Sequence, residues 1–298
     1  MAGIHVLIVT DLEGVAGVLD FDQHCVPEGL RNETACRFLT AETNAAIRGF
    51  FDGGAESVTA LDGHGSGGSL RIEMLDPRAR LQRGVGPDWP GVDGDFQVLA
   101  FVGQHAKSCT PRAHLSHTQM FDAIDFRLNG VSLGEYGQLS WSAAEEHIAT
   151  IFASGDAALE AEVRELTPEA VFVPVKQGLN PPAPPAASSV QCKNSQQSAV
   201  HLAPQAAQEA IYSGALQAMR KYRGNPDAFR LALPPPPYCA QAEYRPTGPE
   251  MTKIVGALPA RRITTRKQPS VAAALREFYR EIEWIAPDGD RVIEYQPR

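Results

Sequence analysis

Four ionisable side chains of metal-binding types lie directly after predicted strands in this sequence. They are Asp11, Glu13, His64 and His105. The strands that precede them are apolar, β-branched runs at residues 4–10, 57–61 and 96–102. In open parallel sheets the carboxyl ends of the strands border the crevice that binds ligands. We therefore expect these four side chains to converge at one edge of a sheet.

The spacing of Asp11 and Glu13 favours a shared cation. Residues two apart in an extended chain point to the same side, so these carboxylates would lie close together. Gathered carboxylates repel one another, and their pKa values rise unless a cation is present. With two neutral imidazoles, His64 and His105, they form a mixed nitrogen and oxygen ligand set typical of zinc, manganese, cobalt or iron. The sequence thus predicts a metal site.

Each residue type also has a purely structural interpretation. An acid after a strand is often a turn former or helix cap. We predict that role for Asp62, with a contact to His64 as the functional alternative. A lone histidine is more often a satisfied polar residue than a ligand. We apply this interpretation to five histidines without a partner pattern: His5, His24, His114, His147 and His201.

Other motifs suggest different chemistry. Residues 63–68 (GHGSGG) match the spacing of a dinucleotide-binding loop, but no long helix or suitably placed acid is expected behind them. We predict a flexible loop at the metal site, with phosphate binding as a minor alternative. Ser116 and His117 are adjacent and would point to opposite sides, so they cannot pair as nucleophile and base. Catalysis by Cys109 is not expected, since Pro111 disfavours the helix that would align it with His105.

The remaining pattern predicts an α/β fold with a mostly parallel sheet flanked by helices. Further strands are expected at residues 125–128, 131–133, 148–153, 170–175, 240–244 and 262–265. Helices are expected at residues 32–51, 135–147, 156–166, 204–222 and 270–284. Asn129 and Gly130 predict a two-residue hairpin turn, because both tolerate positive φ.

Composition suggests a division of the chain after residue 177. Residues 1–177 alternate strands and helices and carry the motifs, so we expect an α/β metal-binding catalytic domain there. Residues 178–193 contain a proline-rich stretch at 180–189, which cannot hold a ladder or a helix interior. We expect this stretch to be a surface loop that opens a smaller α+β part over residues 178–298.

The charge balance and the cysteines exclude several classes of partner. The chain has 27 Lys and Arg against 35 Asp and Glu, a net charge of −8, so it offers no basic field to nucleic acid or an anionic bilayer. Its five cysteines are odd in number and widely spaced, as in a reducing compartment. No secretory leader or membrane span is expected near Asp11, which interrupts the first apolar run. We predict a cytoplasmic protein.

Five motifs, in this order and spacing, resemble the zinc-dependent D-aminopeptidase family encoded with bacterial dipeptide transport systems. They are TDLEGVAG at 10–17, DGHG at 62–65, GQHA at 103–106, LSHT at 115–118 and GEYG at 134–137. The resemblance extends through residue 177 and is thin beyond it.

This resemblance implies two zinc ions per chain, with manganese or cobalt as alternatives. The implied ligands are five side chains of the motifs: Asp11, Glu13, His64, His105 and Glu135. His117 would be catalytic without binding metal, stabilising the oxyanion or protonating the leaving amine. We take Asp11, the shorter acid at the strand tip, as the bridging ligand. The family also implies an α/β domain with a smaller second one, assembled into a ring-shaped decamer.

Two departures from the family pattern bear on the substrate. Relatives usually carry asparagine near position 69, where this chain has Ser69, and an arginine-containing stretch that residues 178–197 lack. We predict a dinuclear-metal amide hydrolase, an aminopeptidase releasing N-terminal amino acids from short peptides or amides by metal-activated hydroxide. The resemblance implies that these are D-amino acids, while the residues themselves support metal-dependent hydrolysis more than D-specificity. The alternatives are hydrolysis of another small amide, lactam or ester, a metal-dependent phosphoesterase, and a non-catalytic peptide- or nucleotide-binding protein.

Overall fold

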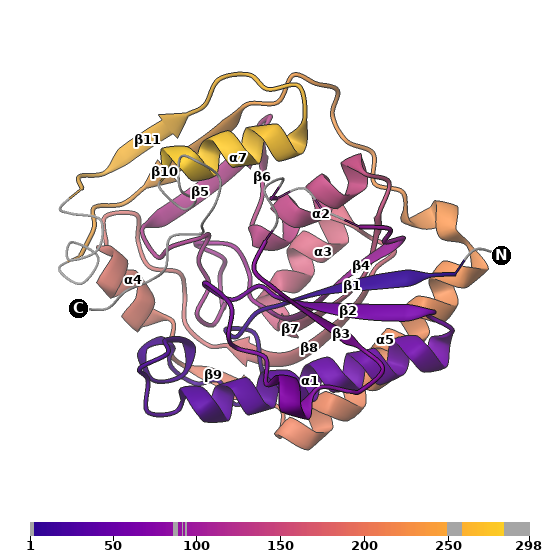
Figure 1. Cartoon of the computed structure of the whole chain (residues 1–298). Coiled ribbons are helices and arrows are strands. Elements are labelled where there is room, and N and C mark those ends of the chain that lie inside the picture. Colours follow the sequence, from indigo (N-terminus) through magenta and orange to yellow (C-terminus); the bar gives the residue numbers. More distant parts are fainter. Residues whose placement is uncertain (1–2, 86–88, 91, 93, 249–257, 283–298) are drawn as a thin grey trace.

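The computed structural model describes residues 3–85, 89–90, 92, 94–248 and 258–282. The chain forms two sheets with helices packed on them (Figure 1), and the larger sheet is mostly parallel. The predicted α/β fold is therefore confirmed. Within the described ranges, no helix is both long enough and apolar enough to cross a membrane.

The larger sheet has seven strands in the order β3-β2-β1-β4-β7-β8-β9, and neighbours pair in parallel except β8 and β9. The strands are β1 (His5–Thr10), β2 (Ser57–Asp62), β3 (Arg80–Arg83), β4 (Val98–Gln104), β7 (Ala149–Asp156), β8 (Val171–Gly178) and β9 (Ala199–His201). In β1, Val6 and Ile8 pack into the core on one face and Leu7 and Val9 into the core on the other. Burial on both faces explains why this strand is apolar throughout.

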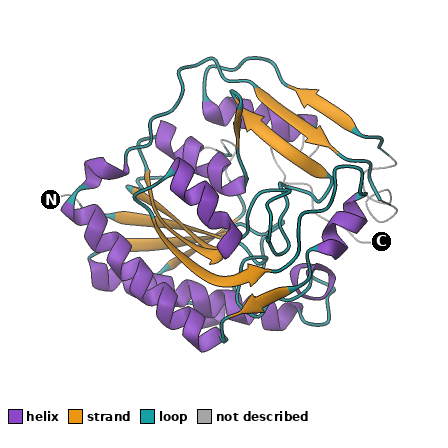
Figure 2. Cartoon of the chain, turned by 180° about the vertical axis from the view of Figure 1, so that it is seen from behind, coloured by secondary structure: helices purple, strands orange, loops and turns teal. Residues whose placement is uncertain are grey.

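Helices cover both faces of the larger sheet (Figure 2). One face carries α1 (Asn32–Gly53) and α5 (Pro204–Gly224), and the other carries α2 (Glu135–Glu145) and α3 (Glu160–Leu166). A Cβ atom added at Gly49 of α1 would lie 2.5 Å from the carbonyl oxygen of Tyr212 in α5. The close approach of these two helices therefore depends on a glycine at this position.

The smaller sheet is antiparallel and has the order β11-β10-β5-β6. It contains β5 (Ala123–Leu128), β6 (Val131–Ser132), β10 (Ala240–Tyr244) and β11 (Arg261–Thr264), and α7 (Val271–Glu281) packs on it. Asn129 and Gly130 have φ of 49° and 84° and form the predicted hairpin turn. Phe126 of β5 and Phe278 of α7 pack with ring centroids 4.6 Å apart.

Both sheets cross the predicted boundary after residue 177. The smaller sheet pairs β5, from before the boundary, with β10, from after it. The larger sheet includes β9, which also comes from after the boundary and pairs with β8. The division into 1–177 and 178–298 does not describe the sheets, and as a division into folding units it stays a prediction. The proline-rich stretch connects β8 to α4 (Ser189–Ser195), and its Ala183 and Ala187 are buried beside Cys192.

Some elements differ from the sequence predictions. The edge strands β3 and β9, the helix α4 and a one-turn π-helix (Phe21–Cys25) were not predicted, because such short segments carry little periodicity. The helix expected from residue 156 begins later, since Asp156 still pairs with Lys176 in the sheet. The Asp156 carboxylate then accepts a hydrogen bond from Ala158 N at 3.4 Å and caps a 3-10 turn. The expected last residues of the final helix, 283–284, lie outside the described residues.

Candidate metal centre

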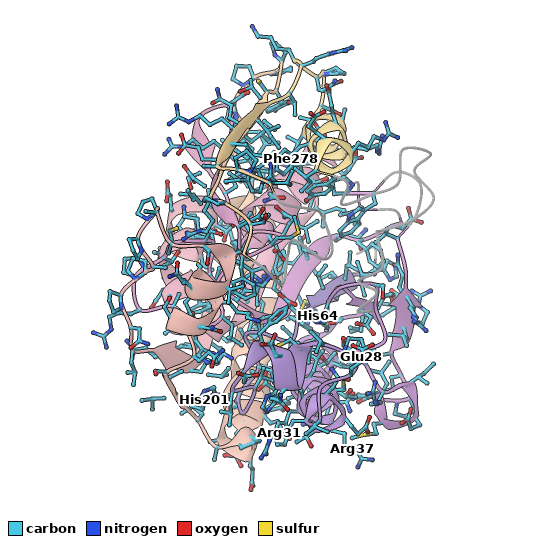
Figure 3. The ribbon with its side chains drawn as sticks, turned by 90° about the vertical axis from the view of Figure 1, so that its left-hand side faces the viewer. Glu28, Arg31, Arg37, His64, His201 and Phe278 are labelled. Carbon is cyan, nitrogen blue, oxygen red and sulfur yellow. The ribbon has the colours of Figure 1, made fainter. Side chains whose placement is uncertain are left out.

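The residues that follow three adjacent strands meet at one edge of the larger sheet. Because β1 lies between β2 and β4, Asp11 occupies the middle of the group. Asp11 Oδ1 lies 3.0 Å from His64 Nδ1, and Asp11 Oδ2 lies 3.2 Å from His105 Nε2. Each oxygen of this carboxylate thus faces a different imidazole. His64 lies within the body of the molecule, whereas Arg37 extends from its edge (Figure 3).

Two further carboxylates complete the cluster. Glu13 is 1% exposed, and its Oε2 lies 3.1 Å from His64 Nδ1. Although burial opposes the shift, the charge of His64 holds the pKa of Glu13 well below its ordinary value. Glu135 is the first residue of α2, where the helix dipole favours a negative charge. Its Oε2 lies 3.7 Å from His105 Nε2, and its Oε1 accepts a hydrogen bond from Gln119 N at 2.7 Å.

The imidazoles are oriented by backbone carbonyls on their outer sides. His64 Nε2 lies 2.7 Å from Cys25 O, which leaves Nδ1 facing the carboxylates. His105 Nδ1 lies 2.9 Å from Ala106 O, which leaves Nε2 facing them. Histidines that bind metals usually donate their other ring N–H to such a partner, which fixes the tautomer. In the neutral form that binds a metal, both rings would therefore present an acceptor nitrogen to the centre of the cluster.

His117 lies beside these residues, and its ring is also oriented by a backbone carbonyl. Its ring stacks on that of His105, with centroids 4.1 Å apart and planes 17° apart. His117 Nδ1 lies 2.9 Å from Leu115 O, so Nε2 remains available. Burial and the neighbouring charge of His105 lower the pKa of His117, which favours the neutral imidazole. Ligand atoms of His117, His105 and Glu135 lie within 4.8 Å of one another.

The carboxylates and imidazoles shift one another's pKa values. Burial and the charge of Glu13 raise the pKa of Asp11 to about 7. Burial opposes the charged form of His105, but the charges of Glu135 and Asp11 outweigh it and raise the His105 pKa to about 10. At His64 burial is likewise outweighed by the charge of Glu13, and the pKa rises well above its ordinary value. The cluster therefore attracts positive charge.

The donor set fits a divalent transition metal. Three carboxylates and two imidazoles match the ligands that zinc and its neighbours take in proteins. Glu13 Oε1 is buried and has no hydrogen-bond partner within the described part of the chain, while Glu13 Oε2 and His105 Nε2 are buried with only ion-pair contacts to other members of the cluster. Such groups are costly to bury unless something binds them. Ligand atoms of Asp11, Glu13 and His105 lie within 4.8 Å of one another, close enough to belong to one metal centre.

Two loops approach each other closely to build this centre. Gly14 N donates to Gly103 O at 2.7 Å, which joins the loop after β1 to the end of β4. A Cβ atom at Gly103 would lie 2.0 Å from the carbonyl oxygen of Asp11, and Gly103 has φ of 77°. The glycine of the GQHA motif therefore permits the contact that brings His105 to Asp11.

The remaining motifs have structural roles. Asp62 Oδ2 accepts hydrogen bonds from the backbone N–H groups of Gly68, Ser69 and Leu70, so the prediction of a turn former is confirmed. The glycine-rich loop leads only to a 3-10 turn (Ile72–Met74), without the helix that a dinucleotide site requires. Ser116 Oγ donates to Gln196 Oε1 at 2.7 Å and is not paired with His117.

Sequence patterns missed two buried ionisable residues around the loop that carries Asp11. Glu42 of α1 accepts a hydrogen bond from Ala16 N at 2.9 Å, and burial raises its pKa to about 8. Lys176 of β8 donates to Val18 O at 3.1 Å, and burial lowers its pKa to about 8. Glu42 lies on the apolar stripe of α1, three residues after the buried Leu39, which is a signal that could have identified it.

Comparisons with known proteins bear on the family and the fold of this chain. The model of the D-aminopeptidase family, peptidase family M55, matches residues 4–283. A D-aminopeptidase of Bacillus subtilis (strain 168) is 30% identical over 174 residues, which cover 57% of this chain and 62% of the relative. The chain thus spans less than two thirds of that relative. The solved structure of the Zn-dependent D-aminopeptidase DppA from Bacillus subtilis, described as a self-compartmentalizing protease, has the same fold. The two structures have a TM-score of 0.78 and 22% sequence identity, and the match covers 94% of this chain and 97% of DppA. Because the family model matches nearly the whole sequence, the chain belongs to the D-aminopeptidase family.

Proposed function

We propose that this chain is a zinc-dependent aminopeptidase that releases N-terminal D-residues from short peptides or amides. The observation that carries the proposal is the cluster itself, in which two buried carboxylates, Asp11 and Glu13, and the partly exposed Glu135 face imidazole nitrogens oriented by backbone carbonyls. Family membership supports the aminopeptidase activity. The Zn-dependent D-aminopeptidase with the same fold supports the choice of metal and of configuration.

The proposed centre holds two zinc ions per chain. Asp11 would be the shared ligand, since its two oxygens face His64 and His105 separately. Glu13 lies on the His64 side and Glu135 on the His105 side, so each half has a carboxylate and an imidazole besides Asp11. Two ions would neutralise carboxylates that otherwise repel one another. Manganese or cobalt would suit the same ligands.

The chain's own residues would orient the substrate and move protons. Zinc, when bound, supplies a Lewis acid that polarises an amide carbonyl and makes water acidic near neutral pH. His117 is neutral and has Nδ1 turned to Leu115 O, so Nε2 can take up a proton and pass it to the leaving amine. Once protonated, the same nitrogen would donate a hydrogen bond to the developing oxyanion. A carboxylate of the cluster would attract the free α-ammonium group and favour cleavage at the N-terminus.

A metal-reconstitution experiment with a substrate panel tests this function. Protein stripped with a chelator and reloaded with zinc should bind about two ions per chain under the two-metal scheme. It should then hydrolyse D-aminoacyl amides and short D-peptides faster than their L-counterparts. His114→Ala is the matched control for His105→Ala, because His114 is also a buried histidine but lies outside the cluster. No zinc binding by the wild-type protein would contradict the proposal.

The panel also separates the alternatives. Hydrolysis of L-amides, lactams or esters in preference to D-amides would retain the metal hydrolase and change the substrate. Activity on a generic phosphate ester without amide hydrolysis would select a phosphoesterase. Retention of a peptide or nucleotide without turnover would select a binding protein.

We further propose that the chain assembles into a ring-shaped decamer in the cytoplasm. The self-compartmentalizing DppA supports an assembly of several copies. The five cysteines are free, in keeping with a reducing compartment. Light scattering coupled to size-exclusion chromatography should give a mass near ten times 32.2 kDa. A monomeric mass would contradict the assembly without affecting the proposed chemistry.

A further inference from the structure

The helix that begins with Glu135 also carries Gln138, a buried amide that has no role in the proposed reaction. Gln138 lies three residues after Glu135 in α2, so the two side chains project from neighbouring positions on one face of the helix. Gln138 is wholly buried. A polar side chain in such a place must be held by specific partners to be tolerated.

Gln138 Oε1 accepts hydrogen bonds from two residues that are far from it in sequence. Tyr279 of α7 donates its hydroxyl proton over 2.7 Å, and Gln119 Nε2 donates over 3.0 Å. Burial raises the pKa of Tyr279 well above its ordinary value, so the phenol keeps the proton that it donates. One amide oxygen thus joins α2, α7 and the loop that contains His117.

Gln119 connects Gln138 to the metal centre. Its backbone N–H donates to Glu135 Oε1 over 2.7 Å, while Glu135 Oε2 is directed toward His105 Nε2 at 3.7 Å. Gln119 has φ of 57°, a left-handed conformation that a non-glycine residue keeps only when its surroundings hold it. The bond from its side chain to Gln138 supplies part of that support. Gln119 also lies two residues after His117.

We propose that Gln138 is a positioning residue for the metal centre. It holds Gln119, and the backbone of Gln119 fixes Glu135 with one oxygen turned toward the centre. Gln138 itself binds neither metal nor substrate. The inference rests on the proposed function in one respect, since it takes Glu135 as a zinc ligand. It also gives the C-terminal helix α7 a part in organising a centre built from the first half of the chain.

Three variants of the full-length protein test this role through zinc affinity. Gln138→Met keeps the volume of the side chain and removes its polar atoms, and Tyr279→Phe removes one donor to Gln138. Tyr136→Phe is the matched control, because Tyr136 is a buried tyrosine of α2 whose hydroxyl bonds Thr167 and has no bond to Gln138. The zinc dissociation constant is measured by competition with a chromophoric chelator, and the unfolding temperature is measured in EDTA.

The expected change in zinc affinity depends on which hydrogen bond of Gln138 each variant removes. Gln138→Met should weaken zinc binding about tenfold, the lower end of the range found when direct partners of metal ligands are removed, because Gln138 acts on Glu135 through Gln119. Tyr279→Phe should weaken it about three- to tenfold, since one neutral hydrogen bond is lost. Tyr136→Phe should leave zinc affinity within about twofold of wild type. Both tyrosine variants should unfold at similar temperatures in EDTA, so a general loss of stability would not reproduce the difference in affinity.

The outcomes distinguish failure of the positioning role of Gln138 from failure of the proposed zinc-dependent function. Wild-type zinc affinity in Gln138→Met would overturn the positioning role. So would equal affinities in Tyr279→Phe and Tyr136→Phe, a comparison that stands even if Gln138→Met does not fold. Wild-type protein that binds no zinc would remove the proposed function itself and the inference with it.

Discussion

Two pairs of buried or half-buried histidines in this chain have opposite electrostatic surroundings. His64 and His105 lie among carboxylates at the metal centre, and their pKa values are raised despite burial. His114 and His201 pack edge to face, with ring centroids 5.3 Å apart. Burial and the charge of Lys176 lower their pKa values, to about 2 for His114 and about 4 for His201. His64 and His201 also lie apart in the molecule (Figure 3).

The comparison separates burial from charge as causes of histidine behaviour. Burial disfavours the imidazolium ion in both pairs. Only the carboxylates of Asp11, Glu13 and Glu135 reverse the effect, so only that region favours a cation. His114 and His201 are expected to remain neutral and to stabilise the fold through packing. Four predictions, in order of decreasing effect, test this distinction.

The largest effect is expected for His105→Ala, because His105 belongs to both groups of potential ligands. The variant should lose bound zinc, and hydrolysis should fall roughly 10³-fold or more, since a metal Lewis acid contributes several kcal/mol to catalysis. Metal analysis and initial rates on a D-aminoacyl amide measure both quantities. His114→Ala should retain zinc and most of the activity. If the two variants retain equal amounts of metal, the distinction between the two pairs is wrong.

His117→Ala should retain zinc while kcat falls about 10²- to 10⁴-fold, the usual contribution of a proton-transferring side chain. The reason is that His117 is expected to transfer protons without binding the ions. Zinc content and kcat are measured on the same preparation. A loss of zinc would make His117 a ligand, a role that its distance to His105 and Glu135 also permits.

Metal removal should lower stability by about 4 kcal/mol for each bound ion when free zinc is 1,000 times that ion's dissociation constant, because the ions bind only the folded chain. Urea unfolding with excess zinc and with EDTA measures this difference. It should vanish in His105→Ala and persist in His114→Ala. The same difference in both variants would place the stabilising zinc outside the proposed centre.

The smallest effect concerns the pH dependence of folding in EDTA. Because the pKa of His114 in the folded protein, about 2, lies below the ordinary 6.5, the unfolded chain binds more protons below pH 6.5. Stability due to this group is therefore present above pH 6.5 and is lost as the pH falls toward 2. Between pH 7 and pH 4.5, His114→Gln should lose roughly 2–3 kcal/mol less than wild type. Urea unfolding at a series of pH values measures it, and parallel profiles would mean that His114 is protonated equally in both states.

Much of the centre could be predicted because its residues obey a local rule. Asp11, Glu13, His64 and His105 each follow a strand, and the strands of a parallel sheet end at the same edge. Glu135 follows a hairpin and begins a helix, so no strand-end pattern leads to it, and only the family resemblance identified it. Gln119 and Gln138 were missed because polar residues in a loop and on a helix give no sign of their burial.

Local patterns of side chains specify which segments form buried strands and which ionisable residues terminate them. The order of the strands depends on tertiary packing, which puts β1 between β2 and β4 and so places Asp11 between two imidazoles. Tertiary packing also pairs β5 with β10 and lets Tyr279 of α7 bond Gln138. These contacts join residues more than 100 positions apart, and their free energy depends on the packing of the whole chain rather than on local periodicity.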